Sequence, residues 1–288
     1  MRFPIVTAAV VWLSLLGGAA AQPQEGLLDV MMVKFKPEKR TELYAAAKKM
    51  ADANRQQKGD AWLGSEVMYG ESGTVSFLSL RTSYADVESG MGKFMASLTK
   101  GYGPAGSAKL LQDFDACVLS ARTELRRRRT DLSANAPRDP AALFKLVGEA
   151  RFVRTTAVRV RPGRGPEYER LLLRLKAAAE RTMPGPVLLV SQAVAGTNGT
   201  YYYVSSLQDS LAGFDAVPTL PQLLGTEYAN YARSGADLIL GTETWISRYV
   251  PELSNPPEEI AAVAPDFWRP KPAAPAKPKP KAAAPKTQ

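Results

Sequence analysis

The sequence predicts an α+β protein made of two tandem ferredoxin-like β-α-β-β-α-β units that pack sheet to sheet. Three observations predict it: an internal repeat of domain length, the same order of expected elements in both copies, and an ordinary globular composition. The 288 residues are 45% hydrophobic and 23% charged, which is enough for two modest domains. A repeat of this length indicates two copies of one unit rather than a solenoid.

The repeat is visible in three pairs of segments that share their apolar and small residues. The pairs are 33–37 (VKFKP) with 158–162 (VRVRP), 65–73 with 191–199, and 118–120 with 245–247. The offset rises by single residues from the first pair to the last, as short loop insertions would produce. We therefore expect the segments of each pair to occupy equivalent places.

The first copy is predicted to run strand, helix, two strands, helix, strand. The expected ranges are 28–36, 37–57, 62–69, 74–80, 83–99 and 116–124. Leu43, Ala47 and Met50 recur at helical spacing, which predicts one buried face for the first helix. The glycines of 70–73 mark a tight turn between the two middle strands.

The second copy repeats this order. The expected strands are 154–161, 187–195, 200–207 and 239–248, and the first helix is 165–182. Asn198-Gly199 suits a two-residue hairpin between the middle strands. Pro218 and Pro221 break the next helical region into two pieces.

This order leaves one face of each four-stranded sheet without helices. Alternation places Val30 and Met32 on that face in the first copy, and Thr155 and Ala157 in the second. Two copies in one chain can bury these faces against each other, so we expect an intrachain pseudo-dimer.

Six segments organise the chain. They are a signal peptide at 1–21, repeats at 27–124 and 152–250, a linker with a short helix at 125–151, a short helical extension at 251–264, and a disordered Pro/Ala/Lys-rich tail at 265–288. Arg2, an apolar run and small residues before Gln22 predict export to the periplasm or the exterior. Phe267-Trp268 is expected to dock on the folded part, where order ends.

The net charge of +9 arises mostly in the tail, since the folded region between the two ends is close to neutral. The tail could bind an anionic envelope surface, or it could simply solubilise the protein. A specific nucleic-acid partner is not expected, because the basic residues do not gather on a folded face.

Familiar catalytic sites are excluded by composition. The chain has no His and one Cys, so His-dependent triads, imidazole zinc sites and haem with a proximal His are ruled out. It also lacks the phosphate-loop, nucleophile-elbow and dinucleotide-binding motifs. We expect no metal and no cofactor.

The repeated β-α-β-β-α-β order, the V-[K/R]-x-[K/R]-P strand end and the Gly-rich hairpin resemble the dimeric α+β barrel superfamily. The antibiotic-biosynthesis-monooxygenase-like and NIPSNAP-like domains are the most similar in style, over residues 27–124 and 152–250. The resemblance implies a pseudo-dimeric α+β barrel. Its members include cofactor-free oxygenases, haem enzymes and proteins without known activity, and the haem branches rely on the missing His.

Four positions on the paired strands are candidate ligand-binding residues. Lys34 and Arg159 are equivalent and could form an anion-binding rim, or they could keep strand ends soluble. Glu66 and Gln192 are also equivalent. If they point into the barrel, they could contact a ligand, with Glu66 as a base, or they could fix how the halves meet.

Aromatic and arginine residues give two further hypotheses. A flat apolar ligand could lie between Tyr202 and Trp245, although strand packing alone explains such rings. The run Arg126–Arg129 could bind phosphate, but a solvated strand extension is the favoured interpretation.

The predicted function is that of an exported tandem barrel protein that binds a small apolar or anionic ligand, or an envelope partner, without a recognisable catalytic motif. The alternative is a cofactor-independent monooxygenase acting on an aromatic or quinone-like substrate. Such an enzyme needs an enclosed apolar cavity with a few convergent polar groups.

Overall fold

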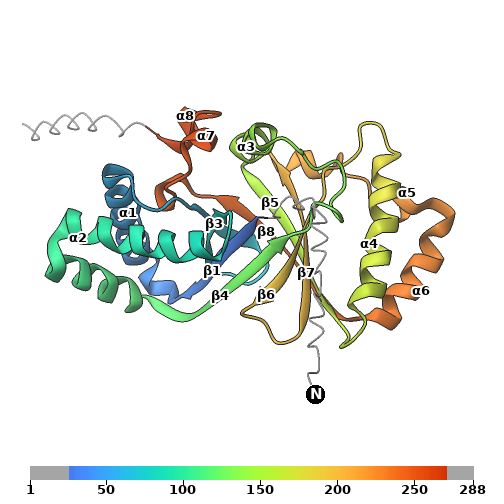
Figure 1. Ribbon diagram of the computed structural model, residues 1–288, viewed down its shortest axis with the longest axis horizontal. Helices are drawn as coiled ribbons and strands as arrows, with labels where there is room; N and C mark the ends of the chain where they lie inside the picture. The colour runs from blue at the N-terminus through green and yellow to red at the C-terminus, as the bar shows by residue number, and fades with distance from the viewer. Residues whose placement is uncertain (1–25, 271–288) are drawn as a thin grey trace, which may run out of the picture.

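A computed structural model describes residues 26–270 of the chain, and in it eight antiparallel strands close one barrel (Figure 1). The strand order around the barrel is β1-β3-β2-β8-β5-β7-β6-β4. The strands are β1 (Leu27–Phe35), β2 (Leu63–Tyr69), β3 (Thr74–Arg81), β4 (Val118–Arg128), β5 (Phe152–Val160), β6 (Leu189–Ala195), β7 (Thr200–Gln208) and β8 (Ile239–Tyr249).

The helices lie outside the barrel, on opposite sides of it (Figure 1). They are α1 (Arg40–Gln57), α2 (Tyr84–Asp115), α3 (Pro140–Glu149), α4 (Gly165–Glu180), α5 (Leu220–Leu224), α6 (Tyr228–Leu238), α7 (Glu258–Ala261) and α8 (Pro265–Trp268). Short 3-10 turns complete the described chain at Pro37–Lys39, Ala212–Phe214, Gly225–Glu227 and Pro251–Leu253.

Each half of the chain supplies four adjacent strands of the barrel. The first half contributes β4-β1-β3-β2 and the second β8-β5-β7-β6, so the halves meet at two seams, β2 with β8 and β4 with β6. The predicted fold class of two β-α-β-β-α-β units packed as one α+β barrel is therefore confirmed.

Alternation along the strands separates two environments. In β1, Val33 and Phe35 face the helices and are buried with Leu43 of α1 and Leu98 of α2. Val158 and Val160 of β5 belong to the equivalent core beneath α4. The intervening residues face the barrel lumen, because successive side chains of a strand point to opposite faces.

The sheet faces predicted to lack helices are buried inside the barrel. Val30, Met32 and Thr155 line its lumen, and Ala157 is 7% exposed. The two halves thus cover each other's second face, as the sequence predicted.

Two elements differ from their predicted extent. Helix α2 continues to Asp115 instead of ending near residue 99 and is kinked at Gly103, whose φ of 71° is a left-handed conformation that glycine adopts readily. Strand β4 continues to Arg128, beyond the predicted residue 124.

The predicted equivalence of 118–120 with 245–247 is wrong. Val118 pairs with Phe35, while Ile239 pairs with Val160, so the start of β4 corresponds to the start of β8. The error arose because strands of similar composition align in several registers when the loop lengths between them are unknown.

The C-terminal extension packs back onto the molecule. Trp268 is fully buried in α8, donates from Nε1 to Gly148 O of α3 at 2.9 Å, and contacts the rings of Tyr249 and Phe267. Docking of Phe267-Trp268 is confirmed, but the predicted start of the disordered tail at residue 265 is wrong, because α8 is ordered. The predicted signal peptide and the remainder of the predicted tail, from residue 271, lie outside the described residues.

Within residues 26–270, no helix combines the length and the apolar character that a membrane span requires.

Candidate functional site

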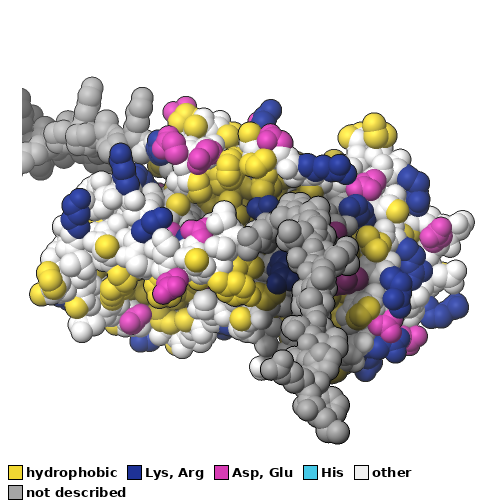
Figure 2. All heavy atoms as spheres, in the orientation of Figure 1, with side chains coloured by type: hydrophobic (Ala, Val, Ile, Leu, Met, Phe, Trp, Pro, Cys, Tyr) yellow, Lys and Arg dark blue, Asp and Glu magenta, His cyan; other side chains and the backbone are white. Residues whose placement is uncertain are grey.

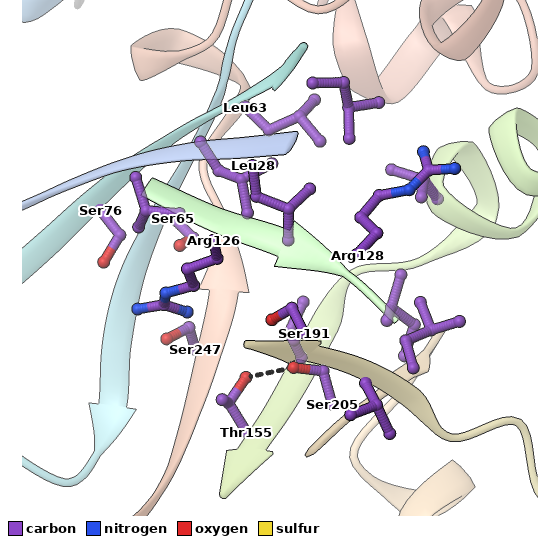
Figure 3. A pocket seen from close by; sticks show the side chains of 18 of the residues that line it. Leu28, Leu63, Ser65, Ser76, Arg126, Arg128, Thr155, Ser191, Ser205 and Ser247 are labelled. Carbon is purple, nitrogen blue, oxygen red and sulfur yellow. Dashed lines mark hydrogen bonds between the residues drawn. The ribbon is translucent and has the colours of Figure 1, made fainter. Parts of the chain in front are cut away.

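The barrel lumen contains a cavity of about 170 Å³ (Figure 3). Both halves and α3 line it with aliphatic side chains. These include Leu28, Val30, Leu63, Leu78, Leu80, Leu143, Val147, Val153, Leu189 and Leu207. Every strand of the barrel contributes at least one lining residue, so the cavity exists only when the two halves are assembled.

A set of small hydroxyl groups interrupts this apolar wall. Thr155 and Ser205 hydrogen bond to each other across β5 and β7, with 3.0 Å between their oxygens. Four other seryl side chains have no hydrogen-bond partner among the described residues. They are Ser65, Ser76, Ser191 and Ser247. Ser191 and Ser247 are only 6% and 4% exposed, so their hydroxyls are directed at enclosed space.

A buried ionic cluster adjoins the cavity. The carboxylate of Glu124, which is 1% exposed, accepts hydrogen bonds at Oε2 from Arg126 Nε (2.8 Å) and from the Tyr203 hydroxyl (2.7 Å). Arg122 Nη2 lies 2.9 Å from its Oε1, an ionic contact without hydrogen-bond geometry, so Oε1 accepts no hydrogen bond within residues 26–270. Burial raises the pKa of the Tyr203 phenol above its ordinary value, so Tyr203 stays neutral and acts as a donor.

The guanidinium of Arg126 is held on three sides. Its central carbon lies 3.5 Å from the centroid of the Tyr203 ring, its Nε and Nη2 both contact Glu124, and Nη2 also approaches Met32 Sδ at 3.9 Å. Nη1 has no acceptor among the described residues. Figure 3 shows the side chain extending from β4 toward the wall formed by Ser65, Ser76 and Ser247.

Strand alternation explains how part of the arginine run reaches the lumen. Arg126 and Arg128 line the cavity, whereas Arg127 between them is exposed on the outer face. The predicted solvated strand extension is therefore wrong for Arg126, which is 6% exposed. The four arginines are alike in sequence, but one face of β4 borders the lumen and the other face is exposed to solvent.

Glu66 lies on the outer face of β2, not in the lumen. It accepts hydrogen bonds from Arg40 of α1 at 2.9 Å and from Arg248 of β8 at 3.2 Å. Burial alone would raise the pKa of Glu66, but hydrogen bonds from Tyr44 and Arg40 outweigh it, and the pKa lies below its ordinary value. Glu66 thus ties the two halves together at the β2–β8 seam.

Gln192 occupies the corresponding place at the other seam. Its side chain accepts from Arg129 Nη1 at 2.9 Å and donates to the Tyr202 hydroxyl at 3.1 Å, and Glu169 of α4 joins the same group. Neither Glu66 nor Gln192 lines the cavity, so the hypothesis of a ligand contact inside the barrel does not hold, whereas their contacts agree with the alternative that they fix how the halves meet. The register of β2 and β6 turns both residues toward the helices.

Tyr202 and Trp245 do not flank a common space. Tyr202 is 1% exposed beneath α4, with its ring centroid 5.0 Å from that of Tyr168, whereas Trp245 lines the lumen. The aromatic residue that faces the lumen cluster is Tyr203, one position further along β7. Assigning the faces of Tyr201-Tyr202-Tyr203 correctly required the strand register, which the sequence did not provide.

Lys34 and Arg159 form no shared rim. Lys34 is paired with Glu71 at 2.5 Å, and Arg159 is exposed on β5. Neither residue lines the cavity. The residues that the sequence missed are Glu124, Tyr203 and the seryl hydroxyls, and Arg126 was considered only within the run Arg126–Arg129. The period-2 pattern of β4 could have singled out Glu124 and Arg126 as two charges on one face.

No protein-family model and no curated protein matches the sequence. Among solved structures, an anthrone oxidase-like protein superposes with a TM-score of 0.50 at 15% identity, covering 78% of this chain and 92% of that one. A proposed monooxygenase from Fusobacterium nucleatum subsp. nucleatum ATCC 25586 gives 0.49 at 13% identity, covering 79% and 94%. One from Lactobacillus acidophilus NCFM gives 0.47 at 9% identity, covering 78% and 94%.

Identities this low establish similarity of fold and nothing about activity. With its closed antiparallel barrel and its two β-α-β-β-α-β halves, the chain has the dimeric α+β barrel fold, and one polypeptide supplies both halves of the barrel.

Proposed function

We propose that this protein binds a small, mostly apolar molecule inside its barrel. The observation that supports the proposal is the cavity of about 170 Å³ in the barrel lumen, lined by aliphatic side chains from both halves and by four seryl hydroxyls that have no hydrogen-bond partner within residues 26–270. An eight-stranded barrel has an interior that side chains can fill or that can hold one small ligand. Here the side chains leave space between the two halves.

The size of the cavity limits the ligand. An engineered protein cavity of about 150 Å³ is known to hold benzene, whereas pockets for drug-sized molecules are about 300–1,000 Å³. The lumen therefore suits a molecule with one ring or a short branched chain. A polycyclic molecule would require the barrel to open.

The lumen is also shielded at one end by α3. Leu143 and Val147 of this helix line the cavity, and Trp268 holds the helix from its other side through the bond to Gly148. Helix α3 therefore forms part of the cavity wall.

A cofactor-independent monooxygenase acting on an aromatic or quinone-like substrate is the second candidate, because such an enzyme also needs an enclosed apolar cavity. The carboxylate of Glu124 is poorly placed to serve as the catalytic base of such an enzyme. Glu124 is engaged by Arg122, Arg126 and Tyr203 and does not itself line the cavity. Oxygen uptake with a monocyclic hydroquinone would support this candidate; absence of uptake while the compound binds would favour binding alone.

Export to the periplasm or the exterior is part of the proposal and rests on the sequence of residues 1–21. Binding of the basic tail to an anionic envelope surface rests on composition in the same way. N-terminal sequencing of protein from the native compartment tests export, and a start near Gln22 is the expected result.

The binding proposal is tested with fluorobenzene and ¹⁹F NMR. The wild type should broaden and shift the fluorine signal in a saturable way. Val30→Phe fills the lumen and should abolish binding, whereas Val194→Phe makes the same change at a position that is 37% exposed and should retain it. Ser76→Leu provides a second filling substitution if Val30→Phe does not fold. Equal binding by all variants, or no binding by the wild type, would overturn the proposal.

A further inference from the structure

We infer that the ligand of the barrel lumen is a monocarboxylate and that Arg126 binds its carboxylate group. This inference rests on the proposed binding function and specifies the chemical class of the ligand. It is carried by four features of the lumen: the charge of the ionic cluster, the fixed position of Arg126, the unpartnered donors around it, and the volume available.

The ionic cluster has an excess of positive charge. Arg122 and Arg126 both contact Glu124, so two guanidinium groups share one carboxylate and the net charge is +1. Arg122 is 56% exposed and is solvated, whereas Arg126 and Glu124 are 6% and 1% exposed, so the buried cation that borders the cavity is Arg126. A ligand with one negative charge would neutralise the cluster, whereas a phosphate monoester or a dicarboxylate would overcompensate it.

The position of Arg126 is fixed before a ligand arrives. The Tyr203 ring covers one face of the guanidinium, and Glu124 holds Nε and Nη2. Binding therefore costs little side-chain entropy, which favours affinity. The third nitrogen of the guanidinium, Nη1, is a charged donor that has no acceptor among the described residues. A charged donor with an unused N–H in an enclosed site favours an anionic acceptor.

Other donors surround the same part of the lumen. Ser65, Ser76 and Ser247 lie on the wall toward which Arg126 extends, and none has a side-chain partner within residues 26–270 (Figure 3). A carboxylate has two oxygens with about four acceptor sites, so one guanidinium N–H and several hydroxyls can saturate it. A neutral hydrocarbon would offer no acceptor to these groups, of which Arg126 and Ser247 are buried, so it would bind less favourably than a carboxylate.

The apolar residues that line the cavity determine which hydrocarbon part of the ligand fits. Leu28, Leu63, Leu80 and Val153 form an aliphatic surface, and Trp245 contributes an aromatic one. Together with the volume of about 170 Å³, this lining fits a body of one ring or a short branched chain. Benzoate is a probe with these properties.

The test compares benzoate with benzamide, its neutral isostere, by titration calorimetry at pH 7. The wild type should bind benzoate at least tenfold more tightly, because a hydrogen bond to a charged group contributes more than one between neutral groups. Arg126→Gln should remove this preference. Arg127→Gln, which changes the adjacent exposed arginine of the same strand, should preserve it and so serves as the control for overall charge.

A second variant separates recognition from folding. Glu124→Gln combined with Arg126→Gln removes both charges of the contact and so avoids leaving a buried carboxylate with one partner fewer. Fluorobenzene binding by each variant reports whether the lumen is intact. The double variant should not distinguish benzoate from benzamide, and saturable binding of fluorobenzene by this variant would show that its lumen still forms.

The outcomes distinguish this inference from the binding proposal. Equal affinity of the wild type for benzoate and benzamide, with fluorobenzene still bound, would overturn the carboxylate inference and leave the binding proposal standing. Retention of the benzoate preference in Arg126→Gln would also overturn it, because the anion would then bind elsewhere. Failure of the wild type to bind all three probes would overturn both.

Discussion

Arg126 of β4 is stacked on Tyr203 of β7, with 3.5 Å between the guanidinium carbon and the ring centroid. The two strands belong to different halves and are separated by β6 in the barrel order. Because the Tyr203 hydroxyl also donates to Glu124 of β4, one residue of the second half contacts both charges of the first. Tyr203 therefore both stabilises the assembly of the two halves and holds Arg126 in place at the lumen.

Removing the Tyr203 hydroxyl tests that link. Tyr203→Phe keeps the ring but deletes the donor to buried Glu124, so the free energy of unfolding should fall by about 1.5–3 kcal/mol. Tyr201→Phe, two positions earlier on the same strand, removes a hydroxyl with no hydrogen bond among the described residues and should change stability by less than about 0.5 kcal/mol. Urea unfolding measures both; equal effects would contradict the assigned role of Tyr203.

Two glycines of α2 should respond oppositely to alanine. A Cβ at Gly90 would lie 2.2 Å from Arg81 Nη1, and Arg81 cannot easily retreat because Asp60 holds both of its terminal nitrogens, at 2.6 and 2.7 Å. Gly90→Ala should therefore destabilise the protein by more than about 1 kcal/mol, through loss of a buried ion pair. A Cβ at Gly92 meets no atom within 4 Å, so Gly92→Ala should stabilise by up to about 1 kcal/mol. Thermal unfolding distinguishes the two, and the same sign for both would refute this packing.

Helix α8 should contribute to stability although it begins the segment predicted to be disordered. A chain ending at Ala264 lacks the fully buried Trp268, and removal of such a side chain costs about 3–5 kcal/mol. A chain ending at Pro270 retains every described contact of α8 and is the matched control. The melting temperature of the shorter chain should be lower by several degrees; equal melting temperatures would show that α8 does not dock in solution.

Acid should weaken the β4–β6 seam. Hydrogen bonds from Arg129 lower the pKa of Glu169 below its ordinary 4.5 and that of Asp131 below its ordinary 3.8. Because both pKa values are lower in the folded state, the resulting stability is present above about pH 4.5 and is lost as the pH falls further.

Arg129→Gln should therefore lose less stability than the wild type between pH 5 and about pH 3. Urea unfolding across this range measures the slope, and Arg127→Gln, which changes an exposed neighbour, should keep the wild-type slope. A slope for Arg129→Gln as steep as that of the wild type would show that other carboxylates determine the acid response.

The fold could be predicted from the sequence because each of its elements is specified by a short segment of the chain. The strand ends at 33–37 and 158–162, the Gly-rich hairpins and the helical spacing of Leu43, Ala47 and Met50 each specify an element within a few residues. The apolar face bearing Val30 and Met32 then required a partner, and the second copy was the available one. Closure into one barrel follows from that requirement.

The cluster of Glu124, Arg126 and Tyr203 could not be predicted from the sequence, because it depends on the register between strands that are distant in the chain. Tyr203 rather than Tyr202 faces the lumen because of its pairing with Ala157, and Glu124 meets Tyr203 across β6. A shift of one residue reverses every side chain of a strand, so the same sequence pattern is compatible with Glu66 or with Glu124 inside. For Glu66, Gln192 and Tyr202, a contact with a lumen ligand was one of two alternatives, and the register turns all three toward the helices.

A crystal structure of the protein soaked with bromobenzene tests ligand binding in the lumen most directly, because the anomalous signal of bromine locates the compound. The expected result is one bromine position inside the barrel, among Leu28, Leu63 and Leu80, with the ring between the two halves. A lumen that contains only ordered water, with bromine on the outer surface or nowhere, would contradict the claim that the barrel is a binding site for a small apolar molecule.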